Sequence, residues 1–326
     1  MTVNRRLLLQ QAACAMTAAT SWARAGAETG VPPADRELRV PVKGGSLYVR
    51  INGDLQRGKP PLLLVHGGPG GALWQMFPAL PLASERAVIL YDQLDSGRSD
   101  APGDPANWTV DRFVSEIDAI RAALALDRLH LLGHSWGGIV ANRYAARQPA
   151  GLRSLILQGT PLSAARLATS VQSLYAKLPD GAGAVIVAHE RAGTTSDPAY
   201  AKAMRVFMRK HLARTSVKDI AMPYMAPTPE DRGDALAAAM TGGKIGDFGG
   251  VLAGFNDEPL LSRVAVPTLL LAAEFDIVTP EATHAVQPLL KRGRYAEIAN
   301  AGHMAQFDQP EAWRAAIQAF LADNDA

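Results

Sequence analysis

The strongest chemical signal in the sequence is a serine between two glycines, in the pentapeptide G-H-S-W-G at positions 133–137. The pentapeptide follows the apolar run 129–132, which predicts a strand, and leads into 136–147, which predicts a helix. A tight turn from strand to helix lifts a serine hydroxyl above the edge of a sheet, and flanking glycines leave room for that turn. We therefore interpret Ser135 as a nucleophile that forms an acyl-enzyme with an ester or an amide.

A histidine late in the chain fits the base that this nucleophile needs, because a serine hydroxyl attacks poorly at neutral pH on its own. His303 lies just beyond 294–298, a predicted strand. An imidazole titrates near neutral pH, so it can take the proton of Ser135 and return it later. A lone histidine in a loop is usually a surface residue, but its place downstream of the serine favours the catalytic role.

An aspartate between these two residues completes the set. Asp276 follows the apolar run 266–272, at the end of a predicted late strand, where an acid that orients the histidine is expected. Glu274 and Asp257 are rival carboxylates, although Glu274 lies nearer the strand and Asp257 lies in a predicted insertion. The chain order serine, aspartate, histidine predicts a catalytic triad on an α/β-hydrolase fold.

A glycine-rich loop supplies candidates for the second half of the chemistry. The sequence H-G-G-P-G-G at 66–71 follows the apolar run 62–65. Acyl transfer needs two N–H donors aimed at the developing oxyanion. We expect them to be the backbone N–H groups of Gly68, in this loop, and Trp136, next to the nucleophile. A phosphate-binding loop is excluded because no Lys-Ser/Thr pair follows the glycines.

Composition excludes several other classes of protein. Hydrophobic residues make up 48% of the 326-residue chain, and 33 basic residues nearly balance 31 acidic ones. A chain this balanced, with no long basic run, predicts no nucleic-acid partner. The single cysteine, Cys14, rules out an internal disulfide and a cysteine-rich metal site. No metal or other cofactor is expected, since neither His66 nor His134 has a metal-ligand constellation around it.

The first 27 residues predict an export signal. Arg5 and Arg6 precede a mildly apolar stretch at 7–19, and Ala-Arg-Ala at 23–25 offers a cleavage site. The arginine pair favours twin-arginine export, with a general secretory signal or a disordered tail as alternatives. We therefore expect contact with the export machinery, a periplasmic or secreted mature protein, and no stable membrane insertion after processing, because the apolar stretch is too short to span a bilayer.

Strand-like and helix-like segments alternate along the rest of the chain, which predicts a mostly parallel sheet with helices on both faces. The rhythm occupies 38–159 and returns at 263–323, so these two segments are assigned to one core. Between them, 160–262 carries helical stretches, prolines and a glycine cluster but no clear strand. We interpret 160–262 as an inserted, mainly helical cap.

Taken together, these motifs resemble the proline iminopeptidase family, serine aminopeptidases of the α/β-hydrolase fold. The resemblance runs from about Leu38 to Leu321 and covers the glycine loop, the serine pentapeptide and the Asp276/His303 pair. It also includes the residues Tyr91-Asp92-Gln93 and Ser96-Gly97-Arg98-Ser99. The resemblance implies a short-peptide or other small-molecule substrate, bound partly by the cap residues Glu190, Asp247 and Phe248.

One departure from the family bears on specificity. Some members carry a glutamate directly after the triad aspartate, where it holds the free amino group of the substrate, but Ile277 occupies that position here. An ammonium group in a half-buried pocket needs carboxylate partners. The resemblance implies an aminopeptidase-like enzyme, and Ile277 shifts weight toward the alternative, a carboxylesterase or lactonase for small neutral esters. A non-catalytic binding protein on a hydrolase scaffold is a more distant alternative, because the triad and the glycine loop are intact.

Overall fold

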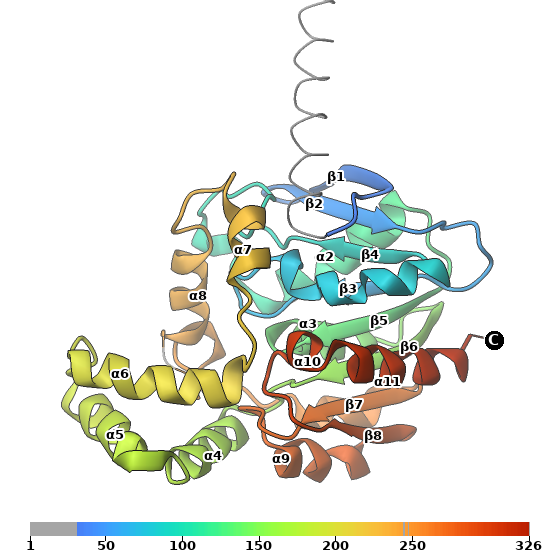
Figure 1. The fold of residues 1–326 in the computed structure, drawn as a ribbon. Coiled ribbons are helices and arrows are strands. Elements are labelled where there is room, and N and C mark those ends of the chain that lie inside the picture. Colours follow the sequence, from blue (N-terminus) through green and yellow to red (C-terminus); the bar gives the residue numbers. More distant parts are fainter. Residues whose placement is uncertain (1–30, 244, 247, 326) are drawn as a thin grey trace, which may run out of the picture.

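The alternating segments build one mixed sheet in the computed structural model, which describes residues 31–243, 245–246 and 248–325. Its strand order is β1-β2-β4-β3-β5-β6-β7-β8 (Figure 1). The strands are β1 (Arg36–Val42), β2 (Gly45–Asn52), β3 (Leu62–Val65), β4 (Val88–Tyr91), β5 (Leu129–His134), β6 (Leu152–Gln158), β7 (Thr268–Ala273) and β8 (Gly293–Ile298). The pairs β1–β2 and β2–β4 are antiparallel and the other five pairs are parallel, so the sheet is mostly parallel, as predicted.

Register within the sheet places the two chemical motifs side by side. In the parallel pair β3 and β5, Leu64 lies opposite Leu132 and Val65 opposite Gly133. Both strands are buried along their whole length, as expected for apolar runs at the centre of a parallel sheet. Because parallel strands end at the same edge, the glycine loop after β3 and the serine turn after β5 emerge next to each other.

Helices cover both faces of the sheet (Figure 1). The described α-helices are α2 (Val110–Ala123), α3 (Trp136–Ala146), α4 (Ala164–Tyr175), α5 (Ala182–Ala192), α6 (Pro198–Phe207), α7 (Lys218–Met225), α8 (Asp234–Thr241), α9 (Pro280–Ala285), α10 (Ala305–Asp308) and α11 (Pro310–Ala322). On one face, α2 and α3 bury residues such as Phe113 and Tyr144. On the other, α11 and the 3₁₀ helix η1 (Leu73–Ser84) bury Trp313 and Met76.

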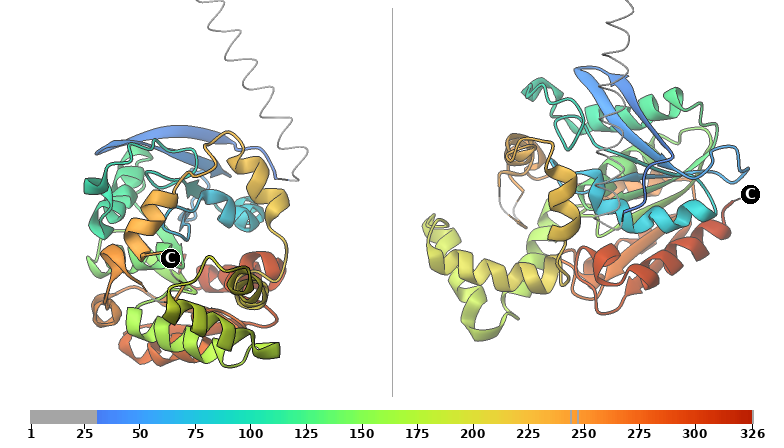
Figure 2. Two further views of the ribbon diagram at one scale, coloured as in Figure 1. Left: turned by 90° about the vertical axis from the view of Figure 1, so that its left-hand side faces the viewer. Right: turned by 45° about the horizontal axis from the view of Figure 1, so that its top comes forward.

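The stretch between β6 and β7 is helical, and its described residues form no strand beyond the single bridge between Ser163 and Asn256. Two further views show α4, α5 and α6 on one side of this stretch and α7 and α8 on the other (Figure 2). Its remaining short elements are η3 (Pro179–Gly181), the π-helical turn η4 (Met208–Leu212), η5 (Gly250–Leu252) and η6 (Glu258–Arg263). The predicted fold, a flanked sheet with a helical cap, is confirmed; the bounds 160–262 stay a prediction.

Two sequence predictions fall on residues outside the described part of the chain. They are the export signal at 1–27 and the cap residue Asp247. Within the described part, the structure contains no helix with the length and apolarity needed to cross a bilayer.

A buried carboxylate fastens the cap to the core. Asp92, just after β4, accepts hydrogen bonds from Leu73 N (2.7 Å), Arg98 N (2.8 Å) and the Tyr224 hydroxyl of α7 (2.5 Å). Burial raises the pKa of Asp92 to about 6, although these donors act in the opposite direction. The pKa of Asp92 in the fold thus lies above the ordinary value of an aspartate, so the stability that this group contributes falls as pH rises toward 6.

Replacing Tyr224 with phenylalanine removes one donor from Asp92. A lost hydrogen bond costs most when the acceptor is charged, so we expect Y224F to lose about 1.5–3 kcal/mol of unfolding free energy at pH 8. We expect a clearly smaller loss at pH 5, where Asp92 is mostly protonated. Urea unfolding at the two pH values measures the difference. Y295F is the control, because the Tyr295 hydroxyl donates to an exposed carboxylate, Glu297. Equal losses for Y224F at both pH values would contradict the assignment.

Candidate active site

The backbone at Ser135 has an unusual conformation that presents its hydroxyl at the edge of the sheet. Ser135 joins β5 to α3 with φ 55° and ψ −122°, a region that L-residues rarely adopt. Neighbouring backbone leaves no space for side chains: a Cβ at Gly133 would lie 2.4 Å from Gly137 O, and one at Gly137 would lie 2.3 Å from Val65 O. The two glycines of the pentapeptide are therefore steric requirements of this turn.

His303 and Asp276 form a buried pair. His303 Nδ1 lies 2.7 Å from Asp276 Oδ1, and the two residues are 4% and 1% exposed. Asp276 Oδ1 also accepts a hydrogen bond from Val278 N at 2.9 Å. A carboxylate at Nδ1 holds the proton on that nitrogen and leaves Nε2 as the basic atom of the ring. This is the arrangement expected of a general base and its orienting acid.

The residue before the nucleophile connects this pair to Ser135. His134 Nε2 donates to the His303 carbonyl oxygen at 3.0 Å, and the two rings lie 4.8 Å apart between centroids. Burial holds the pKa of His134 well below its usual value, so its ring stays neutral beside His303. Ser135, His303 and Asp276, which are far apart along the chain, therefore lie in the same part of the fold, linked through His134.

The rival carboxylates are engaged elsewhere. Glu274 is exposed and accepts a hydrogen bond from Asn300 N at 2.8 Å. Asp257 is buried, but it forms an ion pair with Arg143 at 2.7 Å. Neither contacts His303, whereas Asp276 does. Of the three carboxylates, Asp276 is therefore the one that pairs with His303, and its catalytic role stays a prediction.

The predicted oxyanion donors also lie at this edge. Trp136 is the first residue of α3, so its N–H has no acceptor within the helix. In the glycine loop, Gly67 N already donates to Gln75 Oε1 at 2.9 Å and Pro69 has no N–H, whereas Gly68 N makes no hydrogen bond within the described chain. The loop is also close to the nucleophile, because a Cβ at Gly67 would lie 3.2 Å from Ser135 Cβ.

The cap contacts the candidate general base, His303, through backbone hydrogen bonds. His303 N donates to His211 O at 2.9 Å, and Met304 N donates to Leu212 O at 2.8 Å. Both acceptors belong to η4, at the end of the long segment that carries α4, α5 and α6. The loop that holds the general base is therefore braced by the cap as well as by the sheet.

The two described cap residues that the sequence singled out lie in the cap itself. Glu190 accepts hydrogen bonds from the hydroxyls of Tyr175 and Tyr200, both at 3.3 Å, and lines a hollow with Gln172 and Ile245. Phe248 packs against Phe255 with 5.7 Å between ring centroids. Neither makes a described contact with the triad, so their substrate-binding role stays a prediction.

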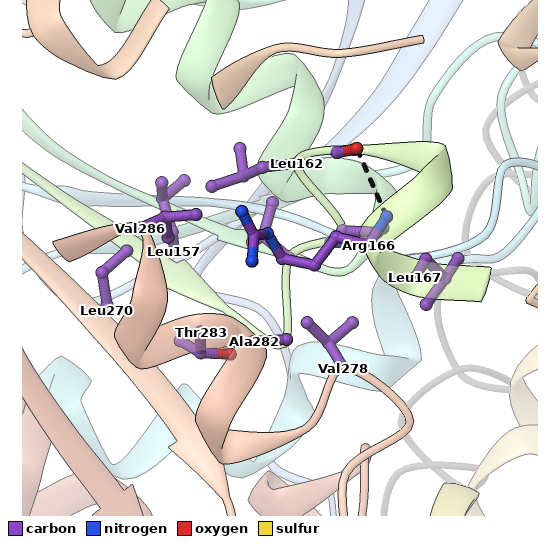
Figure 3. Close-up of a pocket in the computed structure, with 12 residues that line it drawn as sticks. Leu157, Leu162, Arg166, Leu167, Leu270, Val278, Ala282, Thr283 and Val286 are labelled. Carbon is purple, nitrogen blue, oxygen red and sulfur yellow. Dashed lines mark hydrogen bonds between the residues drawn. The ribbon is translucent and has the colours of Figure 1, made fainter. Parts of the chain in front are cut away.

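A separate pocket lies beside the site, between α4, α9 and the strands β6 and β7 (Figure 3). Its wall is mostly aliphatic, with Leu157, Leu167 and Val278 among the side chains. Arg166 extends along it and pairs with Glu258 at 2.6 Å. No triad residue and no oxyanion donor lines this pocket, so it is distinct from the candidate active site.

Gly159 is a site residue that the sequence analysis did not single out. It follows β6 with φ +49°, and a Cβ there would lie 2.7 Å from Asp276 Oδ2 and 3.0 Å from His303 Nδ1. Only a residue without a side chain leaves the acid and the base in contact. A single glycine after a strand carries no distinctive sequence signal, since many loops contain one.

Substituting Gly159 with alanine is expected to displace the Asp276–His303 pair. A shift of about 1 Å in a catalytic group costs about 100-fold in rate, so we expect that loss in kcat for G159A. G58A is the matched control: Gly58 also has positive φ, +83°, but a Cβ there meets nothing within 4 Å. Steady-state kinetics of both variants, with melting temperatures, separate backbone strain from damage to the site. Comparable activity in G159A and G58A would contradict the steric argument.

Comparison with known proteins identifies relatives of the same fold. Residues 60–310 match the family model for the alpha/beta hydrolase fold. A proline iminopeptidase of Heyndrickxia coagulans is 34% identical over 82% of this chain and 92% of its own length. A crystal structure of the Mycobacterium smegmatis proline iminopeptidase superposes with a TM-score of 0.82 at 31% identity, covering 89% and 99% of the two chains. The crystal structure of VinJ also gives 0.82, at 30% identity over 90% and 100%.

Proposed function

Because the chain belongs to the proline iminopeptidase family of α/β-hydrolases, we propose that it cleaves small aminoacyl amides, prolyl amides among them, through an acyl-enzyme on Ser135. Membership of this family makes it a hydrolase. The observation that supports the acyl-enzyme chemistry is the buried His303–Asp276 contact of 2.7 Å, at the same sheet edge as the strained Ser135 turn and the glycine loop. Similarity to proline iminopeptidases supports the aminoacyl substrates.

The proposal assigns a group to each step of the reaction. The hydroxyl of Ser135 attacks the substrate carbonyl while His303 Nε2 accepts its proton. The N–H groups of Gly68 and Trp136 hold the negative charge that develops on the carbonyl oxygen. His303 then gives the proton to the departing amine, which leaves the acyl group on Ser135. Water attacks this ester with His303 again as base, and the acid is released with the serine restored.

The apolar surroundings of the acid favour a second candidate function, hydrolysis of small neutral esters or lactones. Ile277, directly after Asp276, packs against a buried apolar cluster of the cap that includes Leu167, Val171 and Phe207. Partly buried Ile245 and Phe248 pack against the same cluster. An apolar wall stabilises a neutral acyl group, whereas an ammonium group there would lose its hydration without a carboxylate in return.

Alanine at Ser135 tests the mechanism on both substrate classes. We expect S135A to lose about 10⁶-fold in kcat on prolyl-anilides and on p-nitrophenyl esters, because the covalent step is removed. A fluorophosphonate probe should label the wild type and not S135A. The ratio of kcat/KM between the two substrates in the wild type separates peptidase from esterase. Full activity in S135A would end the proposal, and a wild type that the probe fails to label would support a binding protein instead.

Export is a further part of the proposal, supported by the arginine pair, the apolar stretch and the Ala-Arg-Ala site within residues 1–27. We expect the full chain, expressed in a bacterium with a twin-arginine pathway, to appear in the periplasm or medium with its N-terminus trimmed. Replacing Arg5 and Arg6 with lysines should retain the protein in the cytoplasm at full length. Unchanged export of this variant would contradict the twin-arginine route, and absence of the wild type from the exported fractions would contradict export itself.

A further inference from the structure

Two glutamine side chains hold one peptide unit of the glycine loop from opposite ends. The carbonyl oxygen of His66 accepts a hydrogen bond from Gln93 Nε2 at 3.3 Å, and the N–H of Gly67 donates to Gln75 Oε1 at 2.9 Å. These two atoms belong to the same peptide bond, whose C=O and N–H point in opposite directions because it is trans. The plane of this peptide is therefore fixed.

The next peptide unit is fixed by the imidazole of His66. Gly67 O lies 2.8 Å from His66 Nδ1, and Gln93 N donates to His66 Nε2 at 3.2 Å. Since the backbone N–H occupies the lone pair of Nε2, the ring proton sits on Nδ1 and points at Gly67 O. Burial lowers the pKa of His66 to about 4, so the ring is neutral at neutral pH. The Gly67–Gly68 peptide is also trans, so the Gly68 N–H points away from this bond.

Gln93 makes one more contact, and it leads to the other oxyanion donor. Its Oε1 accepts a hydrogen bond from Trp136 Nε1 at 2.8 Å. Trp136 carries the second donor N–H on its backbone, and its indole packs edge-to-face on Phe113. Gln93 itself is fully buried. One side chain, with its own backbone N–H, thus reaches both the glycine loop and the first residue of α3.

We propose that Gln93 is a positioning residue that locks the two oxyanion donors, Gly68 N–H and Trp136 N–H, at a fixed separation. The inference rests on the proposed function. In this role Gln93 does not touch the substrate. It acts through His66 and through the Trp136 indole. Donors of this kind stabilise the transition state only when they are held in place before the reaction, and sites loosened by about 0.5–1 Å lose much of that effect.

The main test is Gln93→Met, which keeps the size of the side chain and removes both amide contacts. We expect kcat to fall about 10- to 100-fold, less than the loss of a whole oxyanion donor, with KM within about threefold. Affinity for a trifluoromethyl ketone, which forms a tetrahedral adduct with the serine, should fall in step with kcat/KM. A role confined to folding would lower stability and leave these two quantities unchanged per folded molecule.

Asn142→Leu is the matched control. Asn142 is a fully buried amide on α3 that contacts Asp257 O, away from the glycine loop. We expect this variant to lose stability while its kcat and its affinity for the ketone stay within about twofold of the wild type. If both variants lose activity in parallel with stability, Gln93 is only a packing residue.

A double-mutant cycle tests the path through the indole. Trp136→Phe removes Nε1–H and keeps the backbone donor. If Gln93 acts partly through that atom, the double variant should lose less than the product of the two single losses. Multiplicative losses would overturn this half of the proposal.

Gln93→Glu is the second variant, in case the methionine does not fold. The glutamate retains an acceptor for Trp136 Nε1 but sets a carboxylate oxygen against His66 O, so kcat should again fall at least 10-fold. Wild-type kcat in either folded variant would overturn the proposal. Failure of the proposed function looks different, because the wild type itself would then neither turn over substrate nor react with a fluorophosphonate.

Discussion

The constraint on which the site depends is the left-handed turn at Ser135, where a residue with a side chain adopts a backbone conformation that favours glycine. The strained backbone of Ser135 persists because closely packed neighbouring segments exclude other conformations. Gly133 and Gly137 let the end of β5, the start of α3 and the end of β3 approach within distances that exclude a Cβ. In addition, Ser135 N donates to the carbonyl oxygen of Gln158, the last residue of β6, at 2.9 Å. Backbone contacts with β3, β5 and β6 therefore fix the position of Ser135 and of its hydroxyl.

From this turn outward, the site is built from neutral hydrogen bonds more than from ion pairs. The side chain of Gln158 accepts from Trp313 Nε1 at 2.8 Å and donates to Gln306 at 2.6 Å, in the helix just after His303. Gln306 in turn donates to the carbonyl oxygen of Gln75 at 3.2 Å. Buried amides that satisfy one another fix geometry without adding charge that would compete for the reacting oxygen. Within the candidate triad, the carboxylate of Asp276 contacts the imidazole of His303.

The sequence predicted the fold class, and it singled out three candidate triad residues, because those signals are local. A serine turn needs its glycines within two positions, and buried parallel strands are short continuous apolar runs. What it missed depends on contacts between distant segments. In the sequence, Gln93 is only one residue of a motif, and the contacts of its amide become evident once the end of β4 lies near the glycine loop. The 3₁₀ helix η1 contains Pro78 and Pro81, which interrupt any helical pattern. The roles of Glu190, Asp247 and Phe248 stay predictions, because helical periodicity does not determine how cap helices pack.

The hydrogen bonds from His303 N and Met304 N to η4 have a consequence for how such enzymes diversify. One way to alter specificity would be to exchange the inserted segment while the core is kept. Here the carbonyls of His211 and Leu212 belong to the exchangeable part, yet they accept the backbone hydrogen bonds of His303 and Met304. A graft that replaces this turn removes two supports of the imidazole, even when every catalytic side chain is retained. Recombination boundaries placed between α6 and η4 would keep the turn with the core and leave the helices before it free to vary.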